Sequence, residues 1–337
     1  MATAPYPLKS LNSFGLEAYA KAYVPVHNEA ELLTALQTYQ GQSKFILGGG
    51  SNLLLTQDVD AVVIHLCFKG KTIISQTEDQ VVIEAQGGEN WHEFVQWTLA
   101  QGWGGLENMS LIPGNVGTTP IQNIGAYGME IKDRMVQCTG YHLETGEKRT
   151  FTTAECAFGY RDSIFKQGLK GQYILTAVQF ELTPFTKYAV NTNYGDIQKQ
   201  LAENGIVSPN PADVAQAVIA IRQSKLPDPA KLGNSGSFFK NPIIAKDAFD
   251  VFHEEFPQAP FYTVSDELVK VPAGWLIENA GYKGFRRGDA GVHEKQALVL
   301  VNYGGATGKE IWALAQEIQN AVLVKYGIWI EIGRAHV

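Results

Sequence analysis

Apolar residues recur along the first half of the chain with two periods, which predict alternating helices and strands. Helical spacing at 29–40 and at 90–101, with Asn28 and Asn90 as N-cap residues, predicts two helices. Short apolar runs bounded by polar or glycine residues predict buried strands at 44–47, 61–66, 81–85 and 172–182. The first half is therefore predicted to be a mixed domain of helices and strands.

A stretch rich in proline, asparagine and glycine at 183–210 predicts a boundary between two domains. Beyond it, the pattern predicts a helix at 212–224, a strand at 297–302, a helix at 308–325 and a final strand at 327–330. Thr307 and Glu310 form the signature of a capping box at the start of the last helix. We expect an α+β fold with two domains, the cofactor domain first.

Composition narrows the class of protein. The chain has 337 residues, which suggests two domains of ~150 residues each. Its net charge of −7 argues against non-specific nucleic-acid binding and against a role at a membrane surface. We expect no spanning helix, no secretory signal and no metal site. The cysteines Cys67, Cys138 and Cys156 form no CxxC motif, so we expect reduced thiols in a cytoplasmic protein.

The most informative segment is 104–128, here called the glycine wall. It contains six glycines and a single charge, Glu107, with apolar residues between the glycines and prolines. Glycine allows close backbone approach and proline stiffens the chain, so we expect a rigid, buried backbone that presents N–H groups to an anionic or planar ligand. The alternative interpretation is a turn-rich crossing in the core of a β domain.

A second glycine-rich loop, Gly48-Gly49-Gly50-Ser51-Asn52, directly follows a predicted strand. It has neither the P-loop lysine nor the spacing of a Rossmann fingerprint. Together with the glycine wall, and with Gly87-Gly88 as a third such element, it favours one large ligand with a diphosphate, such as FAD. A tight turn is the alternative for this loop.

Two residues have side chains suited to catalysis. Arg161 stands beside aromatic residues and could clamp a carboxylate through two hydrogen bonds, although a surface pair with Asp162 is the alternative. Ser237 lies between a glycine-rich turn and the bulky pair Phe238-Phe239, where a hydroxyl could deliver a proton to a reacting carbon. The alternative for Ser237 is a loop serine that bonds its own backbone.

Two further features suggest contacts with a ligand. Arg222 and Lys225 share one face of a predicted helix and could meet a phosphate, or could simply be cations favoured at a helix C-terminus. Tyr194 lies in the loop at the predicted domain boundary, where it could close over a substrate or could face solvent.

Six segments, in this order and spacing, resemble the UDP-N-acetylenolpyruvoylglucosamine reductase family over roughly residues 10–332. They are LGGGSNLLL (47–55), GLENMSLIPGNVGTTPIQNIGAYG (105–128), YRDSIFK (160–166), SKLPDP (224–229), GSFFKNP (236–242) and HEKQALVLVN (293–302). The residues 193–196 resemble the form of the family in which a tyrosine loop folds over the nucleotide sugar.

This resemblance implies a vanillyl-alcohol-oxidase (PCMH)-type FAD-binding domain at 15–185 and a C-terminal α+β substrate-binding domain at 200–332. It implies an oxidoreductase of peptidoglycan precursor synthesis that uses FAD and NADPH. The substrate would be UDP-N-acetylglucosamine enolpyruvate and the product UDP-N-acetylmuramate. We expect a cytoplasmic monomer that binds neither nucleic acid nor membrane.

The resemblance also implies roles for individual residues. Arg161 would stabilise the enolate-like charge and Ser237 would protonate the intermediate. Substrate-binding positions are Tyr194, Lys225, Asn241 and Gln296. FAD-binding positions are Gly48, Gly49, Gly50, Ser51, Asn52, Leu53, Pro113, Gly114, Gly117, Thr118, Ile121, Asn123, Gly125 and Ala126.

One motif departs from the family pattern. The family motif has the form (L/I)-E-P-E-V-R, and its second glutamate assists the arginine at the carboxylate. Here Glu331 matches the first glutamate and the second falls at Gly333. We therefore assign Glu331 no catalytic role and expect impaired turnover with retained FAD binding.

Two alternatives to the reductase are a non-catalytic binder of flavin and nucleotide sugar, and an oxidase of the same fold.

Overall fold

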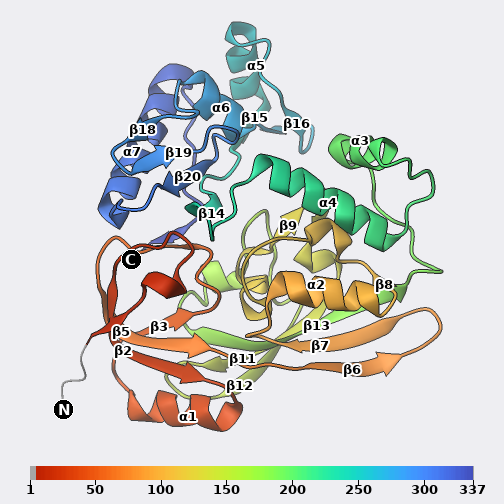
Figure 1. Ribbon diagram of the computed structural model, residues 1–337, viewed down its shortest axis with the longest axis vertical. Coiled ribbons are helices and arrows are strands. Elements are labelled where there is room, and N and C mark those ends of the chain that lie inside the picture. Colours follow the sequence, from red (N-terminus) through yellow and green to blue (C-terminus); the bar gives the residue numbers. More distant parts are fainter. Residues whose placement is uncertain (1–4, 337) are drawn as a thin grey trace. The chain divides into compact units, whose positions relative to one another are not determined.

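The computed structural model describes residues 5–336 and divides into two compact units. The first unit contains the described residues up to Tyr6, together with Ala20–Gly50 and Val59–Ser224. The second unit contains Pro7–Tyr19, Ser51–Asp58 and the chain from Lys225 onward. Figure 1 shows the elements of both units. Each unit is therefore built from segments that are not continuous in sequence.

The regular elements of the first part of the chain alternate helices with strands. The helices are α1 (Glu29–Thr38), α2 (Trp91–Ala100), α3 (Gly195–Glu203) and α4 (Pro211–Lys225). The longer strands are β2 (Tyr19–Val26), β3 (Lys44–Leu47), β5 (Val59–Leu66), β6 (Lys71–Gln76), β7 (Val81–Gln86), β11 (Met135–His142), β12 (Lys148–Thr152) and β13 (Tyr173–Pro184). Short strands are β1 (Tyr6–Pro7), β8 (Trp103–Gly104), β9 (Gly125–Ala126) and β10 (Met129–Glu130).

Two sheets organise these strands, apart from β9 and β10, which pair with each other. One has the order β1-β2-β5-β3, in which β5 pairs in parallel with both β2 and β3, and α1 connects β2 to β3. The other is antiparallel, with the order β12-β11-β13-β7-β6 and with β8 also paired to β13. Helix α2 covers this second sheet (Figure 1), and its Trp91 and Phe94 pack on Phe180 of β13 with ring centroids 5.8 and 5.3 Å away.

The glycine wall follows α2 and contains only short elements. These are β8, β9 and the 3₁₀ turns η2 (Glu107–Met109), η3 (Val116–Thr118) and η4 (Pro120–Gln122). Residues 103–110 of the wall and its approach are buried. Most of its backbone thus lies within the first unit rather than on the surface.

The second unit has a four-stranded sheet, a three-stranded sheet and three helices. The first sheet has the order β14 (Gly233–Ser237), β20 (Val299–Asn302), β19 (Ala290–Val292) and β18 (Arg286–Arg287). The second has the order β15 (Ile243–Ala245), β17 (Leu268–Lys270) and β16 (Tyr262–Thr263). The helices are α5 (Lys246–Glu255), α6 (Ala273–Asn279) and α7 (Gly308–Tyr326), and β4 (Leu53–Leu54) pairs with β21 (Ala335–His336).

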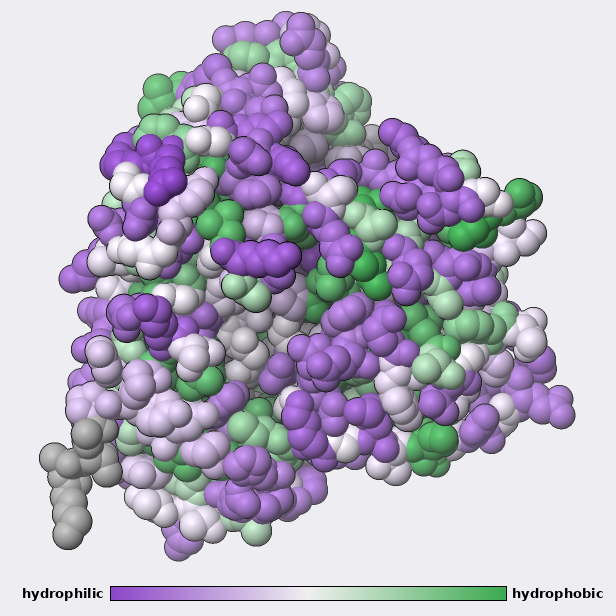
Figure 2. Space-filling model, in the orientation of Figure 1, coloured by the Kyte–Doolittle hydropathy of each residue, from purple (hydrophilic) through white to green (hydrophobic). Residues whose placement is uncertain are grey.

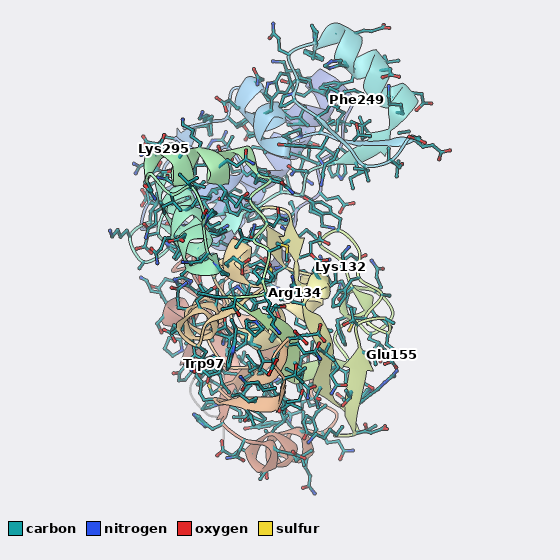
Figure 3. The ribbon with its side chains drawn as sticks, turned by 90° about the vertical axis from the view of Figure 1, so that its right-hand side faces the viewer. Trp97, Lys132, Arg134, Glu155, Phe249 and Lys295 are labelled. Atoms are coloured by element: carbon teal, nitrogen blue, oxygen red, sulfur yellow. The ribbon has the colours of Figure 1, made fainter. Side chains whose placement is uncertain are left out.

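The early segments join the core of the second unit through apolar and polar contacts. Phe14 and Leu54 are buried in the same cluster as Phe238, and the rings of Phe14 and Phe238 lie 6.2 Å apart. The Asn302 amide donates a 2.9 Å hydrogen bond to the Phe14 carbonyl. Phe249, labelled in Figure 3, is carried by α5 and packs into the same cluster. The hydrophobic core of the second unit therefore includes residues from two early segments of the chain, 7–19 and 51–58.

Most of the predicted elements are confirmed. Asn28 and Asn90 cap α1 and α2, and each side chain accepts a hydrogen bond from the backbone N–H three residues later. The capping box of Thr307 and Glu310 is present at the start of α7. The predicted strands at 44–47, 61–66, 81–85, 172–182 and 297–302 and the helix at 212–224 are also present with small shifts at their ends.

The predicted strand at 327–330 is wrong. Gly327 ends α7 with a φ of 67°, and the Ile330 carbonyl accepts from the side-chain amide of Gln319 at 2.7 Å instead of from a neighbouring strand. Strand-like backbone pairing begins two residues later, at Ile332, which forms an isolated antiparallel bridge with Phe239. The described units also differ from the domain boundary expected at residue 200, because α3 and nearly all of α4 belong to the first unit.

Among the residues that the structure describes, no helix is both long and apolar enough for a bilayer crossing. On the face shown in Figure 2, hydrophilic and hydrophobic residues are intermixed.

We predict that Gly308→Ala destabilises the second unit. A Cβ at this first residue of α7 would overlap the carbonyl oxygen of Leu55. Alanine is the better helix former, so propensity alone would raise stability. Overlap with backbone should instead lower the free energy of unfolding by about 1–3 kcal/mol or more. Thermal or denaturant unfolding measures this.

Gly168→Ala is the matched control, because a Cβ at Gly168 would have no neighbour within 4 Å. Equal stability of the two variants would contradict the packing of α7 on Leu55.

Candidate functional site

Three glycine-rich segments meet in the first unit. A Cβ on Gly48 would lie 2.5 Å from the Thr118 side chain, and one on Gly49 would lie 3.0 Å from the Gly114 Cα. A Cβ on Gly117 would lie 2.9 Å from the Gly87 Cα and would also overlap the Leu175 carbonyl oxygen. Gly48, Gly49 and Gly87 are thus in close contact with the glycine wall, and Gly49 and Gly87 approach it backbone against backbone.

Where the glycine wall crosses Gly49 and Gly87, some of its backbone N–H groups are hydrogen-bonded and others are not. Gly117 N–H donates to the Gly87 carbonyl at 2.9 Å, and Thr118 N–H to the Asn115 carbonyl at 3.0 Å. Among the described residues, the N–H groups of Gly114 and Asn115 take part in no such hydrogen bond. Gly117 therefore permits close approach of two segments, whereas Gly114 and Asn115 offer a pair of adjacent donors to an anionic group.

The wall also concentrates backbone strain. Leu111, Asn123 and Tyr127 within it have φ values of 59°, 44° and 50°, in the left-handed region that side chains disfavour. Arg161, which bonds to the wall, has a φ of 54°. Such conformations cost about 1–3 kcal/mol each and persist where surrounding contacts impose them, often at functional sites.

Asn123 holds one of these strained positions in place. Its buried side-chain amide donates to the Glu130 carboxylate at 2.9 Å and to the Gly159 carbonyl at 3.0 Å. Its side-chain oxygen accepts from Lys132 N–H at 3.2 Å. The wall near Asn123 is therefore fastened to two other loops through a single side chain.

Arg161 is directed at the same part of the wall. Its guanidinium donates to the Asn123 carbonyl at 3.1 Å and to the Gly125 carbonyl. Asp162 bonds instead to Ser163 N–H and to the Gln167 amide, at 3.0 and 2.8 Å. The Arg161 guanidinium is thus directed at the glycine wall, and Asp162 has other partners than the surface pair with Arg161.

Tyr194 packs against the end of the wall. Its ring stands edge-on to the ring of Tyr127, with centroids 5.4 Å apart, and it is 42% exposed. Tyr127 also packs on the buried faces of α3 and α4. Tyr194 is therefore in contact with the end of the glycine wall within the first unit.

Arg222, on the buried side of α4, is close enough to influence the wall electrostatically. Burial lowers its pKa, with Tyr127 opposing and Arg161 adding to that effect. Its Nε atom is buried and has no hydrogen-bond partner. Lys225, by contrast, is the exposed last residue of α4. The two cations predicted to act together have different environments.

The remaining predicted residues lie in the second unit. Ser237 is exposed at the end of β14, and its backbone carbonyl accepts a hydrogen bond from Arg334. Asn241 accepts a 3.0 Å hydrogen bond from Ala273 N–H at the start of α6. Gly274 follows Ala273 in α6, and a Cβ added to it would lie 3.3 Å from the carboxamide oxygen of Gln296. Asn241 and Gln296 are thus brought together at one end of α6.

The loop at 51–53 and the divergent segment also lie in this unit. The Asn52 side-chain oxygen accepts from Arg334, and Leu53 pairs with residue 335. Glu331 forms a 2.8 Å ion pair with Lys240. A Cβ on Gly333 would lie 3.4 Å from the Lys240 side chain, so a larger residue would fit there. The pairing of Glu331 with Lys240 agrees with leaving Glu331 without a catalytic role.

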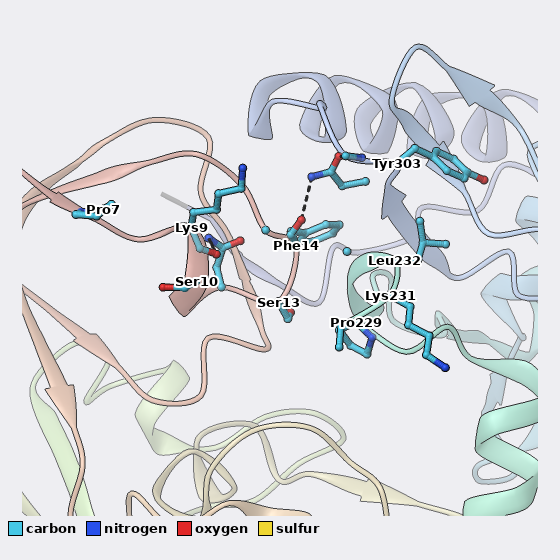
Figure 4. A pocket seen from close by; sticks show the side chains of 15 residues that line it. Pro7, Lys9, Ser10, Ser13, Phe14, Pro229, Lys231, Leu232 and Tyr303 are labelled. Atoms are coloured by element: carbon cyan, nitrogen blue, oxygen red, sulfur yellow. Dashed lines mark hydrogen bonds between the residues drawn. The ribbon is translucent and has the colours of Figure 1, made fainter.

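A hollow of about 750 Å³ in the second unit is separate from these residues (Figure 4). It is lined by parts of the segment from Pro7 to Gly15 and by 229–233 and 302–304. Lys9, which points into this region, is ion-paired with Glu17 at 2.6 Å. None of the predicted site residues lines the hollow.

Several residues that shape the wall were missed by the sequence reasoning. His92 on α2 accepts a 3.0 Å hydrogen bond from the N–H of the strained Leu111. Glu107 and Asn108 are almost completely buried. The one signal in the sequence was Glu107 itself, a single charge in an otherwise uncharged segment, while His92 and Asn108 carried none.

Comparison with known proteins places these features in context. The model for the C-terminal domain of UDP-N-acetylenolpyruvoylglucosamine reductase matches residues 228–333, and a model for a FAD binding domain matches residues 20–150. The UDP-N-acetylenolpyruvoylglucosamine reductase of Flavobacterium johnsoniae is 59% identical over 326 residues, 97% of this chain and 96% of that protein. The reductase of the same name from Chromobacterium violaceum is 49% identical, over 97% of this chain and 96% of that protein.

The fold is similar to that of a solved structure. The crystal structure of UDP-N-acetylenolpyruvylglucosamine reductase (MurB) from Thermus caldophilus matches with a TM-score of 0.69 and 23% identity. The match covers 99% of this chain and 98% of that one. The expected α+β fold, with a FAD-binding domain of the expected type and a C-terminal domain of the reductase family, is confirmed.

We predict that His92 makes stability depend on pH. Burial, followed by the positive charge of Arg222, lowers the His92 pKa below its ordinary value, with Glu93 opposing. The folded protein then holds neutral His92, whereas the unfolded chain takes up a proton as the pH falls below about 6.5. Stability from this residue is present above that pH and is lost on acidification.

His92→Gln keeps a side-chain acceptor for Leu111 but does not titrate. Between pH 7.5 and 5.5, wild type should lose more free energy of unfolding than this variant, by at most about 1 kcal/mol because the His92 side chain is only partly buried. Urea titrations at both pH values measure the difference. Parallel losses in the two proteins would contradict the prediction.

Proposed function

The chain belongs to the UDP-N-acetylenolpyruvoylglucosamine reductase family, and from this premise we propose what its residues do in the reaction. The enzyme is a FAD-dependent oxidoreductase that uses NADPH. It reduces the enolpyruvyl ether of UDP-N-acetylglucosamine enolpyruvate to the lactyl ether of UDP-N-acetylmuramate, a step in peptidoglycan precursor synthesis. The observation that carries this conclusion is the 59% identity to a reductase of that name over 97% of the chain.

The first unit offers features that fit FAD. Close backbone packing at Gly48, Gly49 and Gly117 keeps this surface free of side chains, and Gly114 and Asn115 present adjacent N–H groups suited to a diphosphate. We propose that FAD is held by Gly48, Gly49, Gly50, Ser51, Asn52, Leu53, Pro113, Gly114, Gly117, Thr118, Ile121, Asn123, Gly125 and Ala126. Among these, Gly117 would act by allowing close packing, since its N–H is already bonded.

FAD, reduced by NADPH, supplies the hydride that adds to the enol ether. Negative charge then develops toward the adjacent carboxylate, and stabilising it is the main demand on the protein. We propose Arg161 for this role. A guanidinium has five N–H donors, and the wall carbonyls of Asn123 and Gly125 occupy only part of them, which leaves others for a carboxylate.

Ser237 is proposed as the proton donor to carbon. Its hydroxyl belongs to an exposed residue, while the adjacent Phe238 is buried and fixes the backbone. Gly236, with a φ of 71°, lies within β14 at the irregularity in its pairing between Asn234 and Ser237. We further propose that the nucleotide sugar is bound by Tyr194, Lys225, Asn241 and Gln296. The joint position of Asn241 and Gln296 at the start of α6 supports a shared role.

The domain functions are proposed along the same lines. A FAD-binding domain at 15–185 is supported by the family match at 20–150, and a substrate-binding domain at 200–332 by the match at 228–333. We also propose a cytoplasmic monomer that binds no nucleic acid. The acidic balance, with a net charge of −7, supports the last point.

An anaerobic flavin experiment tests the function directly. The purified protein, with its bound flavin, is reduced with NADPH, and UDP-N-acetylglucosamine enolpyruvate is then added while flavin absorbance is recorded. Return of the oxidised spectrum is expected, more slowly than in a variant with glutamate restored by Gly333→Glu. Reduction without return would support the binding-only alternative and point to Gly333, where the family motif has glutamate. Rapid return in air without the enolpyruvyl compound would support the oxidase.

We predict that Ser237→Ala separates the two half-reactions. Flavin reduction by NADPH should keep its wild-type rate, because Ser237 acts only on the sugar intermediate. Reoxidation by the enolpyruvyl substrate should slow by about 10²–10⁴-fold, the usual contribution of a positioned acid. Stopped-flow absorbance measures both rates. The exposed Ser265→Ala, also in the second unit, is the control, and an unchanged reoxidation rate in Ser237→Ala would refute the assignment.

A further inference from the structure

The glycine wall begins with a buried carboxylate. Glu107 has no exposed surface, and its side chain accepts a 2.6 Å hydrogen bond from Gly105 N–H. Burial raises its pKa, opposed first by that hydrogen bond. A buried carboxyl group costs several kcal/mol unless neighbouring groups compensate it, so the side chains around Glu107 affect its stability.

Two long side chains lie beside Glu107 and explain the glycines next to it. A Cβ on Gly104 would lie 2.6 Å from the Tyr188 ring, and one on Gly105 would lie 3.1 Å from the Arg134 guanidinium. Arg134 lies 5.2 Å from the centre of the Tyr188 ring and donates a 3.4 Å hydrogen bond to its hydroxyl. Figure 3 labels Arg134 among the side chains of this unit. Gly104 and Gly105 therefore make room for these side chains rather than for a ligand.

Tyr188 is the first residue of the segment that leads to Tyr194, here called the tyrosine loop (188–194). Burial raises the pKa of Tyr188, and the nearby Glu107 adds to this effect. The Tyr188 side chain thus contacts Arg134 and lies close enough to Glu107 for the two groups to influence each other electrostatically. The base of the tyrosine loop is held against the start of the glycine wall.

Asn108 holds the same loop at a second point. Its side-chain amide donates to the Asn191 carbonyl at 3.0 Å and to the Tyr127 carbonyl at 2.9 Å. Asn108 is 1% exposed, while its two acceptor residues are partly buried. One amide group therefore ties the middle of the tyrosine loop to the residue whose ring contacts Tyr194.

We propose that Glu107 and Asn108 are positioning residues that hold the tyrosine loop so that Tyr194 stays against Tyr127, ready to bind the nucleotide sugar. This rests on the proposed function, because it takes Tyr194 as a substrate-binding residue. The adjacent pair fixes the loop twice, at Tyr188 and at Asn191, three residues before Tyr194. Neither residue needs to touch the substrate, the flavin or the reacting atoms.

The test uses the flavin-loaded full chain and a variant that removes one attachment. Asn108→Ala removes the donor to Asn191 and Tyr127. The KM for UDP-N-acetylglucosamine enolpyruvate should rise roughly 5- to 10-fold, as expected for lost hydrogen bonds. The rate of flavin reduction by NADPH should stay within about twofold of wild type, because distant sites act independently. Tyr188→Phe, which keeps the ring but removes the hydroxyl, should shift KM in the same direction.

A double-mutant cycle distinguishes positioning from general destabilisation. In a Tyr194→Ala background, Asn108→Ala should produce little further change in KM, because both substitutions remove the same contribution. Asn12→Ala is the matched control. Its buried amide also donates to backbone carbonyls, those of Leu8, Leu16 and Lys9 at 2.9, 3.0 and 3.4 Å, but belongs to the second unit. It should lower stability and leave KM unchanged.

The outcomes separate this inference from the proposed function. If wild type fails to reoxidise with the enolpyruvyl substrate, the proposed function fails and the inference with it. If wild type turns over but KM in Asn108→Ala and in Tyr188→Phe equals that of wild type, only the inference is overturned. A KM increase that persists fully in the Tyr194→Ala background also overturns it, because the effect then does not pass through Tyr194.

Discussion

The close crossing of three glycine-containing backbone segments is the constraint on which the candidate site depends. Gly48 and Gly49 pack against 114–118, and Gly117 packs against Gly87 and β13. No side chain could be added at Gly48, Gly87 or Gly117 without displacing a neighbour. The crossing fixes the wall relative to two different sheets and leaves Gly114 and Asn115 as adjacent donors. The cofactor surface is therefore a consequence of packing within the first unit.

Backbone strain in and beside the wall has to be offset by other contacts. Leu111, Asn123, Tyr127 and Arg161 adopt left-handed conformations, each at a cost of about 1–3 kcal/mol. Leu111 and Asn123 bond to His92 and Glu130 outside the wall, Tyr127 is held by Asn108 within it, and Arg161 is held by Lys166. A rigid and unusual backbone is thus distributed over several anchors, and the large clusters under α2 and β13 provide the rest of the stability.

The sequence allowed prediction of elements whose signals are local. Asn28, Asn90 and the capping box at Thr307 lie next to the helices they begin, so those helices were predicted correctly. The strand predicted at 327–330 failed because Gln319, distant in sequence, bonds Ile330. The units could not be delimited either, since 7–19 and 51–58 return to the second unit through contacts such as Asn302 with Phe14.

The candidate site shows the same division. Glycine-rich segments were recognisable as a group, but a glycine that lets two strands of chain approach, such as Gly117, looks the same in sequence as one that faces a ligand. Glu107 was visible as an isolated charge, yet its partners Arg134 and Tyr188 lie 27 and 81 residues away in sequence (134 − 107 and 188 − 107).

The buried cluster of Glu107, Arg134 and Tyr188 is weak evidence of stabilisation, since apolar replacements of similar volume are often as stable. Apolar side chains could not fix the orientation of the loop in the same way. The Tyr188 hydroxyl accepts a hydrogen bond from Arg134, and the Asn191 carbonyl accepts one from Asn108. Because hydrogen bonds are directional, these two together select one conformation of the tyrosine loop. The cluster is therefore better understood as selecting a conformation than as adding to the free energy of folding.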